Sequence, residues 1–159
     1  MIKLHHRIVS LALSVLFALS LCGTAFAASY DDGIQPQASD YLNGYTAYTY
    51  SAGGGKVQVW FTVSGAGIMD ELGALTITLR ESTDRKNWTI AKVFQYTNTP
   101  NMLFYNRSFV SSHVECTGVV GRYYAATVSV WGGKNGNGDS RQINTPVILL
   151  TSNPTPPSN

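Results

Sequence analysis

One histidine and one cysteine lie close together in the second half of the chain. His113-Val114-Glu115-Cys116 places an imidazole near a thiol, and a cysteine nucleophile needs a thiolate beside such a group. On a β-strand, however, alternate side chains point to opposite faces, so His113 shares a face with Glu115 and not with Cys116. Only a bulge would bring the pair together. We therefore expect no catalytic residues here, and we expect Cys116 to be a buried, unreactive side chain.

Three oxygen-bearing side chains alternate near the C-terminal end, as in a calcium loop. Asn135, Asn137 and Asp139 would supply the first, third and fifth ligands, but the twelfth position, which needs a bidentate Glu, is Pro146. The same stretch contains two Asn-Gly pairs, which are the strongest short signal for a β-hairpin. The pattern therefore predicts a hairpin, with no metal site and no cofactor.

Four carboxylates cluster in two predicted turns. Asp70 and Glu71 stand together in one, and Glu81 and Asp84 flank the other. A glycosidase needs two carboxyl groups about 5 to 9.5 Å apart, usually in a cleft that a small sandwich lacks. The segment from Ser82 to Trp88 is similar to the Asp box of sialidases, which is a hairpin device. We expect these acids to be structural.

Aromatic rings on the outward faces of predicted strands are the stronger lead. Trp60 lies on the polar side of one strand, and Tyr123 and Trp131 lie on the polar side of another, with Arg80 on a strand expected nearby. Exposed rings bind sugar faces or protein partners. The alternative is that loops cover these rings, or that they only flank threonines. We predict Arg80, Tyr123, Trp131 and Trp60 as binding residues.

A two-residue hydrophobic period runs through the chain from about residue 40 onward. Val57, Val59, Phe61 and Val63 share one face, and the even-numbered residues from Tyr124 to Val130 share another. This pattern predicts an all-β sandwich of about seven antiparallel strands. Pro146 should place the last strand at a sheet edge. The expected strands are 44–52, 56–64, 74–82, 88–96, 102–117 (one bent or two short), 122–131 and 141–150, with Leu75, Ile77 and Leu79 inward and at most one helical turn at 69–73.

The first 28 residues have the pattern of a secretory signal peptide. Lys3 and Arg7 precede an apolar run that is too short for a membrane span, and cleavage is expected near Ala27 or Ala28. The remaining boundaries are a flexible segment at 29–39, a β-sandwich domain at 40–151 and a disordered Pro-rich tail at 152–159. The protein is therefore predicted to be secreted and extracellular.

Removal of the leader changes the charge and the cysteine content. The full chain has 11 Lys and Arg residues against 9 Asp and Glu residues. Without Lys3 and Arg7 the balance is zero, so nothing favours nucleic acid as a partner. Cys22 leaves with the leader and Cys116 stays alone, which excludes an intramolecular disulfide.

Two resemblances extend this prediction. The Gly-x-Tyr-Tyr sequence at 121–124 resembles the entry to the sixth strand of immunoglobulin-like and fibronectin type III sandwiches. That resemblance implies that Tyr124 tethers the preceding corner, and that Trp60 lies on one sheet while Arg80, Tyr123 and Trp131 lie on the other. Segments 38–42, 67–74, 81–88, 121–124 and 138–141 together resemble a family of small exported proteins of Gram-positive, clostridia-like bacteria, a domain of unknown function. This second resemblance implies secretion and a β-sandwich, and it carries no site residues.

The favoured hypothesis is a secreted, non-enzymatic binding module for an extracellular glycan or protein. A small secreted effector, such as a bacteriocin-like toxin, is the alternative from another class. An enzyme using His113, Glu115 or Cys116 is a third. The sequence predicts neither the ligand nor the oligomeric state.

Overall fold

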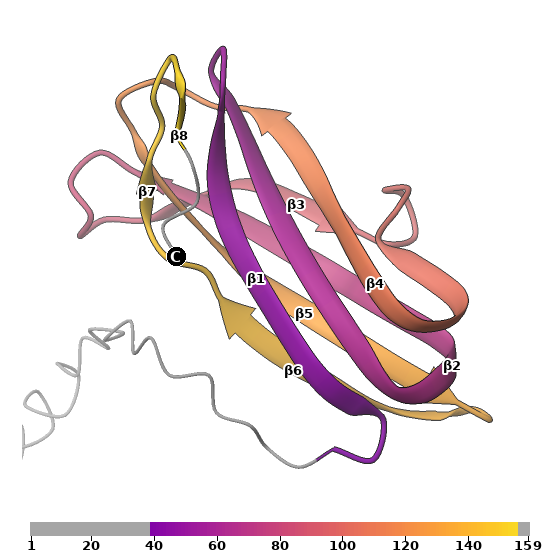
Figure 1. The fold of residues 1–159 in the computed structure, drawn as a ribbon. Helices are drawn as coiled ribbons and strands as arrows, with labels where there is room; N and C mark the ends of the chain where they lie inside the picture. The colour runs from indigo at the N-terminus through magenta and orange to yellow at the C-terminus, as the bar shows by residue number, and fades with distance from the viewer. Residues whose placement is uncertain (1–38, 156–159) are drawn as a thin grey trace, which may run out of the picture. The chain divides into compact units, whose positions relative to one another are not determined.

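Eight β-strands form the regular structure of residues 39–155, the part of the chain that this computed structural model describes (Figure 1). The all-β prediction and the antiparallel pairing are confirmed. No helix that could cross a membrane occurs within the described range. The predicted leader, residues 29–38 and residues 156–159 lie outside it. The strands are β1 (Leu42–Gly53), β2 (Lys56–Ser82), β3 (Thr89–Gln95), β4 (Leu103–Thr117), β5 (Tyr123–Lys134), β6 (Asn137–Asn144), β7 (Ile148–Leu149) and β8 (Pro154–Thr155).

β2 connects the two parts of the sheet. It runs for 27 residues, where the sequence pattern predicts two separate strands, and the helical turn expected at 69–73 is wrong because this stretch is extended. Residues 56–64 of β2 pair with β1 and β4, whereas residues 76–81 pair with β3 and β5. One strand therefore belongs to two sets of neighbours.

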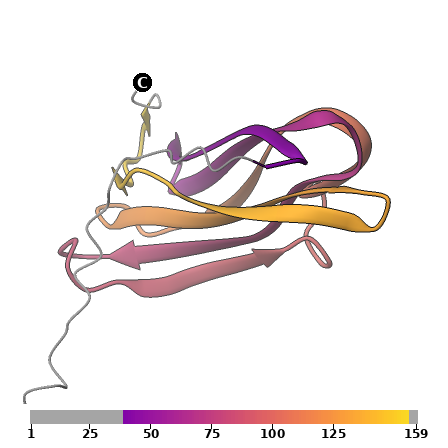
Figure 2. The same cartoon turned by 90° about the horizontal axis from the view of Figure 1, so that it is seen from below.

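The sheet bends where β2 passes from one set of neighbours to the other. The β2–β4 register breaks between Ser64 and Met69, and both strands curve through this region (Figure 1). Figure 2 shows the sheet curving back so that β1 and β3 lie on opposite sides of the molecule. The inward faces of both parts then enclose one core.

A close backbone contact follows the bend. Gly73 has a φ of 152°, and a Cβ there would lie 2.1 Å from the Met102 carbonyl oxygen. The same oxygen accepts a hydrogen bond of 2.8 Å from the Ala74 backbone N–H. Glycine is therefore required for the start of β4 to approach β2 so closely.

The alternating faces of β2 and β5 point inward as the hydrophobic period predicts. Val57, Val59, Phe61 and Val63 are at most 1% exposed, and the even-numbered residues 124–130 of β5 are equally buried. Burying each large apolar side chain contributes roughly 1.5–3 kcal/mol. Leu75 is an exception, because a register shift between Ala74 and Thr76 leaves it half-buried and puts Ala74 in the core.

The C-terminal strands differ from the prediction in their bounds. β6 pairs only with β5 and lies at the sheet edge, as expected, but it ends at Asn144. Pro146 follows it outside any strand, and Ile148–Leu149 then pairs with 123–124. From the predicted tail at 152–159, Pro154–Thr155 forms β8 and pairs with the end of β1.

Tyr124 ties the β4–β5 corner to the core. Its hydroxyl accepts a hydrogen bond of 2.8 Å from the Val119 backbone N–H and donates one of 2.8 Å to Glu81 Oε2. Glu81 also forms an ion pair with Arg122. Burial raises the pKa of Tyr124, so the phenol stays protonated and remains a donor. The predicted tether is confirmed.

Replacement of Tyr124 by Phe should lower the free energy of unfolding by about 1–3 kcal/mol, because the Val119 N–H loses its acceptor and Glu81 keeps only Arg122 as a partner. Urea unfolding followed by fluorescence measures this. Tyr123→Phe is the matched control and should change stability by less than about 0.5 kcal/mol. Equal effects of the two substitutions would contradict the tether.

Gly73→Ala should cost more than about 4 kcal/mol or prevent folding, because the added methyl group meets backbone and not a mobile side chain. Gly67→Ala, whose Cβ would have no atom within 4 Å, should fold normally. Circular dichroism and urea unfolding of both variants test this. A stable Gly73→Ala protein would show that the contact is not required.

Candidate functional site

Trp131 lies over the glycines at the end of the β5–β6 hairpin. Gly133 and Gly138 face each other across the two strands. A Cβ on Gly138 would lie 2.4 Å from Cζ2 of the indole, and one on Gly133 would lie 2.7 Å from its Nε1. The ring therefore packs on backbone that only glycine leaves bare. The hairpin turns through Asn135 and Gly136, whose φ angles of 53° and 77° suit an Asn-Gly turn.

The Trp131 ring lines a shallow cavity of about 270 Å³. Glu71 on β2 lies between the other strands of the pocket, because it pairs with Gly133 on β5 and with Tyr105 on β4. This volume is slightly below the range of about 300–1,000 Å³ that is usual for ligand pockets, which suits one unit of a larger ligand. We call this cavity the Trp131 pocket; its lining residues are Asp70, Glu71, Tyr105, Trp131, Gly133, Lys134, Gly136 and Asn137.

Two carboxylates hold the pocket in shape. Glu71 Oε2 accepts a hydrogen bond of 3.0 Å from the Trp131 indole N–H, and Asp70 Oδ2 accepts one of 2.6 Å from the Asn135 backbone N–H. In the described part of the chain, the other oxygen of each carboxylate accepts no hydrogen bond, and neither group forms an ion pair. Two acceptor positions are therefore available to a ligand.

The remaining polar groups of the pocket are exposed donors. Tyr105 is 61% exposed, and Lys134 and Asn137 are also on the surface. Asn137 Nδ2 donates a long hydrogen bond of 3.4 Å to the Asn135 carbonyl oxygen. An aromatic ring, carboxylate acceptors and exposed donors together can bind a flat molecule that carries several hydroxyl groups.

The other predicted binding residues of this part of the sheet are not gathered at the pocket. Tyr123 lies on the same strand as Trp131, eight residues or about 26 Å away at 3.3 Å per residue. The guanidinium of Arg85 covers its ring at 4.5 Å from the centroid. Arg80 donates a hydrogen bond of 2.9 Å to Thr127 Oγ1, near the middle of β5. Their binding roles stay predictions, but the three side chains form no common site.

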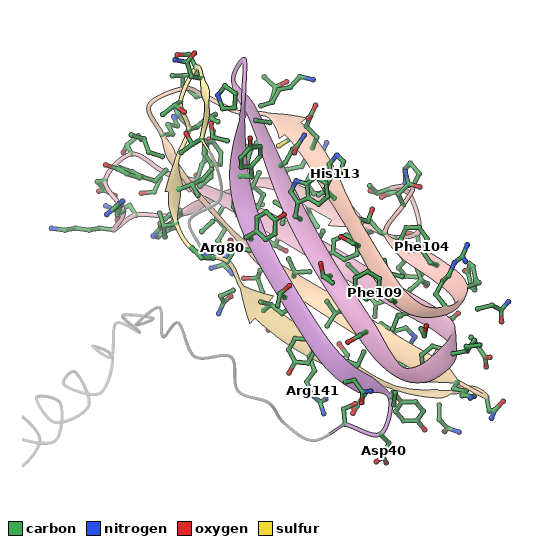
Figure 3. The ribbon with its side chains drawn as sticks, in the orientation of Figure 1. Asp40, Arg80, Phe104, Phe109, His113 and Arg141 are labelled. Atoms are coloured by element: carbon green, nitrogen blue, oxygen red, sulfur yellow. The ribbon has the colours of Figure 1, made fainter. Side chains whose placement is uncertain are left out.

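Trp60 lies on the other part of the sheet, in an aromatic row across β1, β2 and β4. Its ring stacks on His113 at a centroid distance of 4.4 Å, and Tyr48 is parallel to it at 6.3 Å. Figure 3 labels His113 and Arg80, which lie on different parts of the folded sheet. His113 therefore covers one face of the Trp60 indole, and the binding role of Trp60 stays a prediction.

A hydrogen-bond chain fixes the position of this row. The Trp60 indole N–H donates to Gln58 Oε1 at 2.9 Å, and Gln58 Nε2 donates to Glu115 Oε2 at 2.8 Å. Lys56 Nζ lies 2.7 Å from the other oxygen of Glu115. The hydrogen bond from Lys56, followed by that from Gln58, lowers the pKa of Glu115. These groups satisfy one another, so the row is best explained as support for the sheet.

His113 and Cys116 point away from each other, as the strand pattern predicts. The β4 register from Phe109 to Thr117 has no bulge. His113 is exposed, whereas Cys116 is half-buried and packs against the core. Burial raises the pKa of the Cys116 thiol, which lowers its thiolate fraction at neutral pH. The geometry gives no nucleophile–base pair.

The hairpin predicted at Asn135, Asn137 and Asp139 is confirmed. Asp139 pairs with Arg141 at 3.0 Å. Among residues 39–155 there is no group of three or more His, Cys, Asp or Glu side chains that could hold a metal ion.

The Asp84 turn has the structural role that its sequence suggests. Asp84 Oδ1 accepts hydrogen bonds of 2.8 Å from the backbone N–H groups of Lys86 and Asn87, and Oδ2 accepts one of 2.7 Å from Asn87 Nδ2. These bonds, led by that from the Asn87 backbone, hold the pKa of Asp84 far below its ordinary value of 3.8. The turn includes Arg85, which has a positive φ of 62° and reaches back over Tyr123.

The sequence pattern did not single out Tyr105 as a binding residue. It lies in a piece of irregular hydrophobicity and reaches the pocket only through the pairing of β4 with β2. For the position of the Trp131 ring the sequence does contain a signal. Gly133 and Gly138 lie on the same face of the hairpin as Trp131 and leave room for its indole.

The chain matches no protein-family model and no curated protein. The resemblance to small exported bacterial proteins therefore stays a prediction, and a functional proposal has to come from the geometry of the pocket.

Asp84→Asn should make the protein less stable at pH 7, with a difference from the wild type that shrinks on acidification. The folded-state pKa of Asp84 is below its unfolded value, so its contribution is complete well above pH 3.8 and is lost as the pH falls through the folded pKa. Melting temperatures of both proteins between pH 7 and pH 2 test this. A difference independent of pH would contradict the role of the charge.

Proposed function

We propose that this chain is a secreted, non-enzymatic binding module that holds a glycan in the Trp131 pocket. One observation carries the proposal. The indole of Trp131 is fixed over two glycines beside two carboxylates that each keep one oxygen free. A ring held in place loses little conformational entropy when a ligand packs on it, which favours binding.

The chemistry of the pocket suits a sugar better than a protein segment. Sugar hydroxyls both donate and accept hydrogen bonds, and the pocket offers acceptors on Asp70 and Glu71 with donors on Lys134 and Asn137. The C–H face of a sugar ring is apolar and can pack on Trp131 or Tyr105. A shallow pocket of about 270 Å³ fits one unit at the end or side of a longer glycan.

A binding role also agrees with how the carboxylates are used. Asp70 holds the hairpin turn and Glu71 holds the indole. Each group thus has a fixed structural bond in addition to its free oxygen, which suits the recognition of a ligand rather than proton transfer in a reaction.

The proposal includes a fibronectin type III-like sandwich as the scaffold. The pairing order β1–β2–β4 on one part of the sheet and β3–β2–β5–β6 on the other matches two packed layers that share long strands. The Tyr124 tether at the β4–β5 corner supports this assignment. Export rests on the predicted signal peptide, and Cys116, the cysteine among residues 39–155, needs no disulfide partner for folding outside the cell.

Screening of the purified exported chain on a glycan array, followed by calorimetric titration of the ligands found, tests the proposal. Tyr105→Ala should weaken binding at least about tenfold, a loss of about 1.4 kcal/mol, without changing the melting temperature, because the side chain is mostly exposed. Trp131→Phe should also weaken binding.

Tyr96→Ala is the matched control, because Tyr96 is an exposed tyrosine that follows β3 and is not part of the pocket. It should bind as the wild type does. Absence of any glycan ligand, or full affinity of the Tyr105→Ala protein, would contradict the proposed function.

A further inference from the structure

We infer that the glycan bound in the Trp131 pocket carries a free amino group. This inference rests on the proposed function and specifies its ligand. It starts from the charges that line the pocket, which are the carboxylates of Asp70 and Glu71 and the ammonium of Lys134.

The two carboxylates have no cationic partner in the described part of the chain. Lys134 forms no ion pair with either of them. Arg107 follows Tyr105 on β4 opposite Met69, outside the lining of the pocket, and Arg141 pairs with Asp139. With Lys134 counted, the lining has a net charge of −1, and neither carboxylate forms an ion pair among residues 39–155.

An ammonium group complements these features better than a hydroxyl or an acetamide group does. It has three N–H donors, no acceptor and a positive charge, so each hydrogen bond that it makes to Asp70 or Glu71 joins opposite charges, whereas a hydroxyl or acetamide donor is neutral. An N-acetyl group at the same position has one weaker donor and no charge.

The aromatic lining adds to the attraction. A cation within about 6 Å of a ring centroid is attracted to the negative face of the ring, and Trp gives the strongest effect. Trp131 and Tyr105 both line the pocket with the carboxylates. Two rings and two acids outweigh the single ammonium of Lys134, so the cavity favours an organic cation.

The remaining donors indicate an amino sugar and not a lysine side chain of a partner protein. The amide of Asn137 and the phenol of Tyr105 stand at the same pocket, where sugar hydroxyls next to the amine can bond to them. A lysine side chain presents only methylene groups near its ammonium, so it can form no hydrogen bond with these two exposed side chains.

Calorimetric titration of the exported chain with two oligosaccharides of equal length tests the inference. The first is a hexamer of β-1,4-linked glucosamine, and the second is its fully N-acetylated counterpart. The glucosamine hexamer should bind at least about tenfold more tightly, a difference of about 1.4 kcal/mol, and added salt should reduce that preference.

Isosteric variants test whether the preference for the glucosamine hexamer comes from the carboxylates of Asp70 and Glu71. Glu71→Gln and Asp70→Asn keep an acceptor for Trp131 and for the Asn135 N–H, so the pocket should keep its shape while the preference for the amine falls. Glu115→Gln removes a carboxylate from the other part of the sheet and should leave the preference unchanged.

Tighter or equal binding of the N-acetylated hexamer would overturn the inference and leave the proposed glycan function standing. Equal binding of the glucosamine hexamer and of hexalysine would also overturn it, because the pocket would then recognise the ammonium alone. If neither hexamer bound while another glycan did, the amino-sugar inference would fail by itself. If no glycan of any kind bound, both would fail.

Discussion

The structure depends on the constraint that one strand must hydrogen-bond in two parts of the sheet. β2 pairs with β1, β3, β4 and β5. Of the longer strands, only β6 does not hydrogen-bond to it. To pair with the other four, β2 has to turn without losing its extended conformation. The register break after Ser64 and the contact of Gly73 with Met102 make that turn possible. Without them the two inward faces could not enclose one core.

The pocket is a consequence of the same bend. Asp70 and Glu71 lie just after it on β2, at the point where β4 begins and where the β5–β6 hairpin ends. Three segments that are distant in sequence therefore bring their polar groups together. Trp131 covers the hairpin glycines, and Glu71 fixes the ring by accepting a hydrogen bond from its indole N–H. Most of the residues that line the pocket belong to paired strands, and only Gly136 lies in the hairpin turn.

The faces of the strands could be predicted from the sequence, whereas their partners could not. Alternation identified the buried side of 57–63 and of 124–130, because the period of a strand is a local property. The sequence predicts a loop at 65–73, and this prediction is wrong because a strand that bends needs the same glycines and polar residues as a turn. The alternation along β5 predicts that the Trp131 side chain lies on the outer face of the sheet, where it lines the pocket. Tyr105 could not be predicted in this way, because only long-range pairing brings it to the pocket. The cover of Arg85 over Tyr123 depends on a positive φ in the Asp84 turn, which the sequence pattern does not specify.

The central position of β2 has a consequence for how the chain reaches its native state. Its partners extend from residue 42 to residue 133, and β1 also pairs with residues 154 and 155. Almost the whole polypeptide must therefore be present before the main ladders can close. Pairings between such distant residues slow folding. No part of this sheet is expected to become stable early, so it should acquire its structure in a single cooperative step.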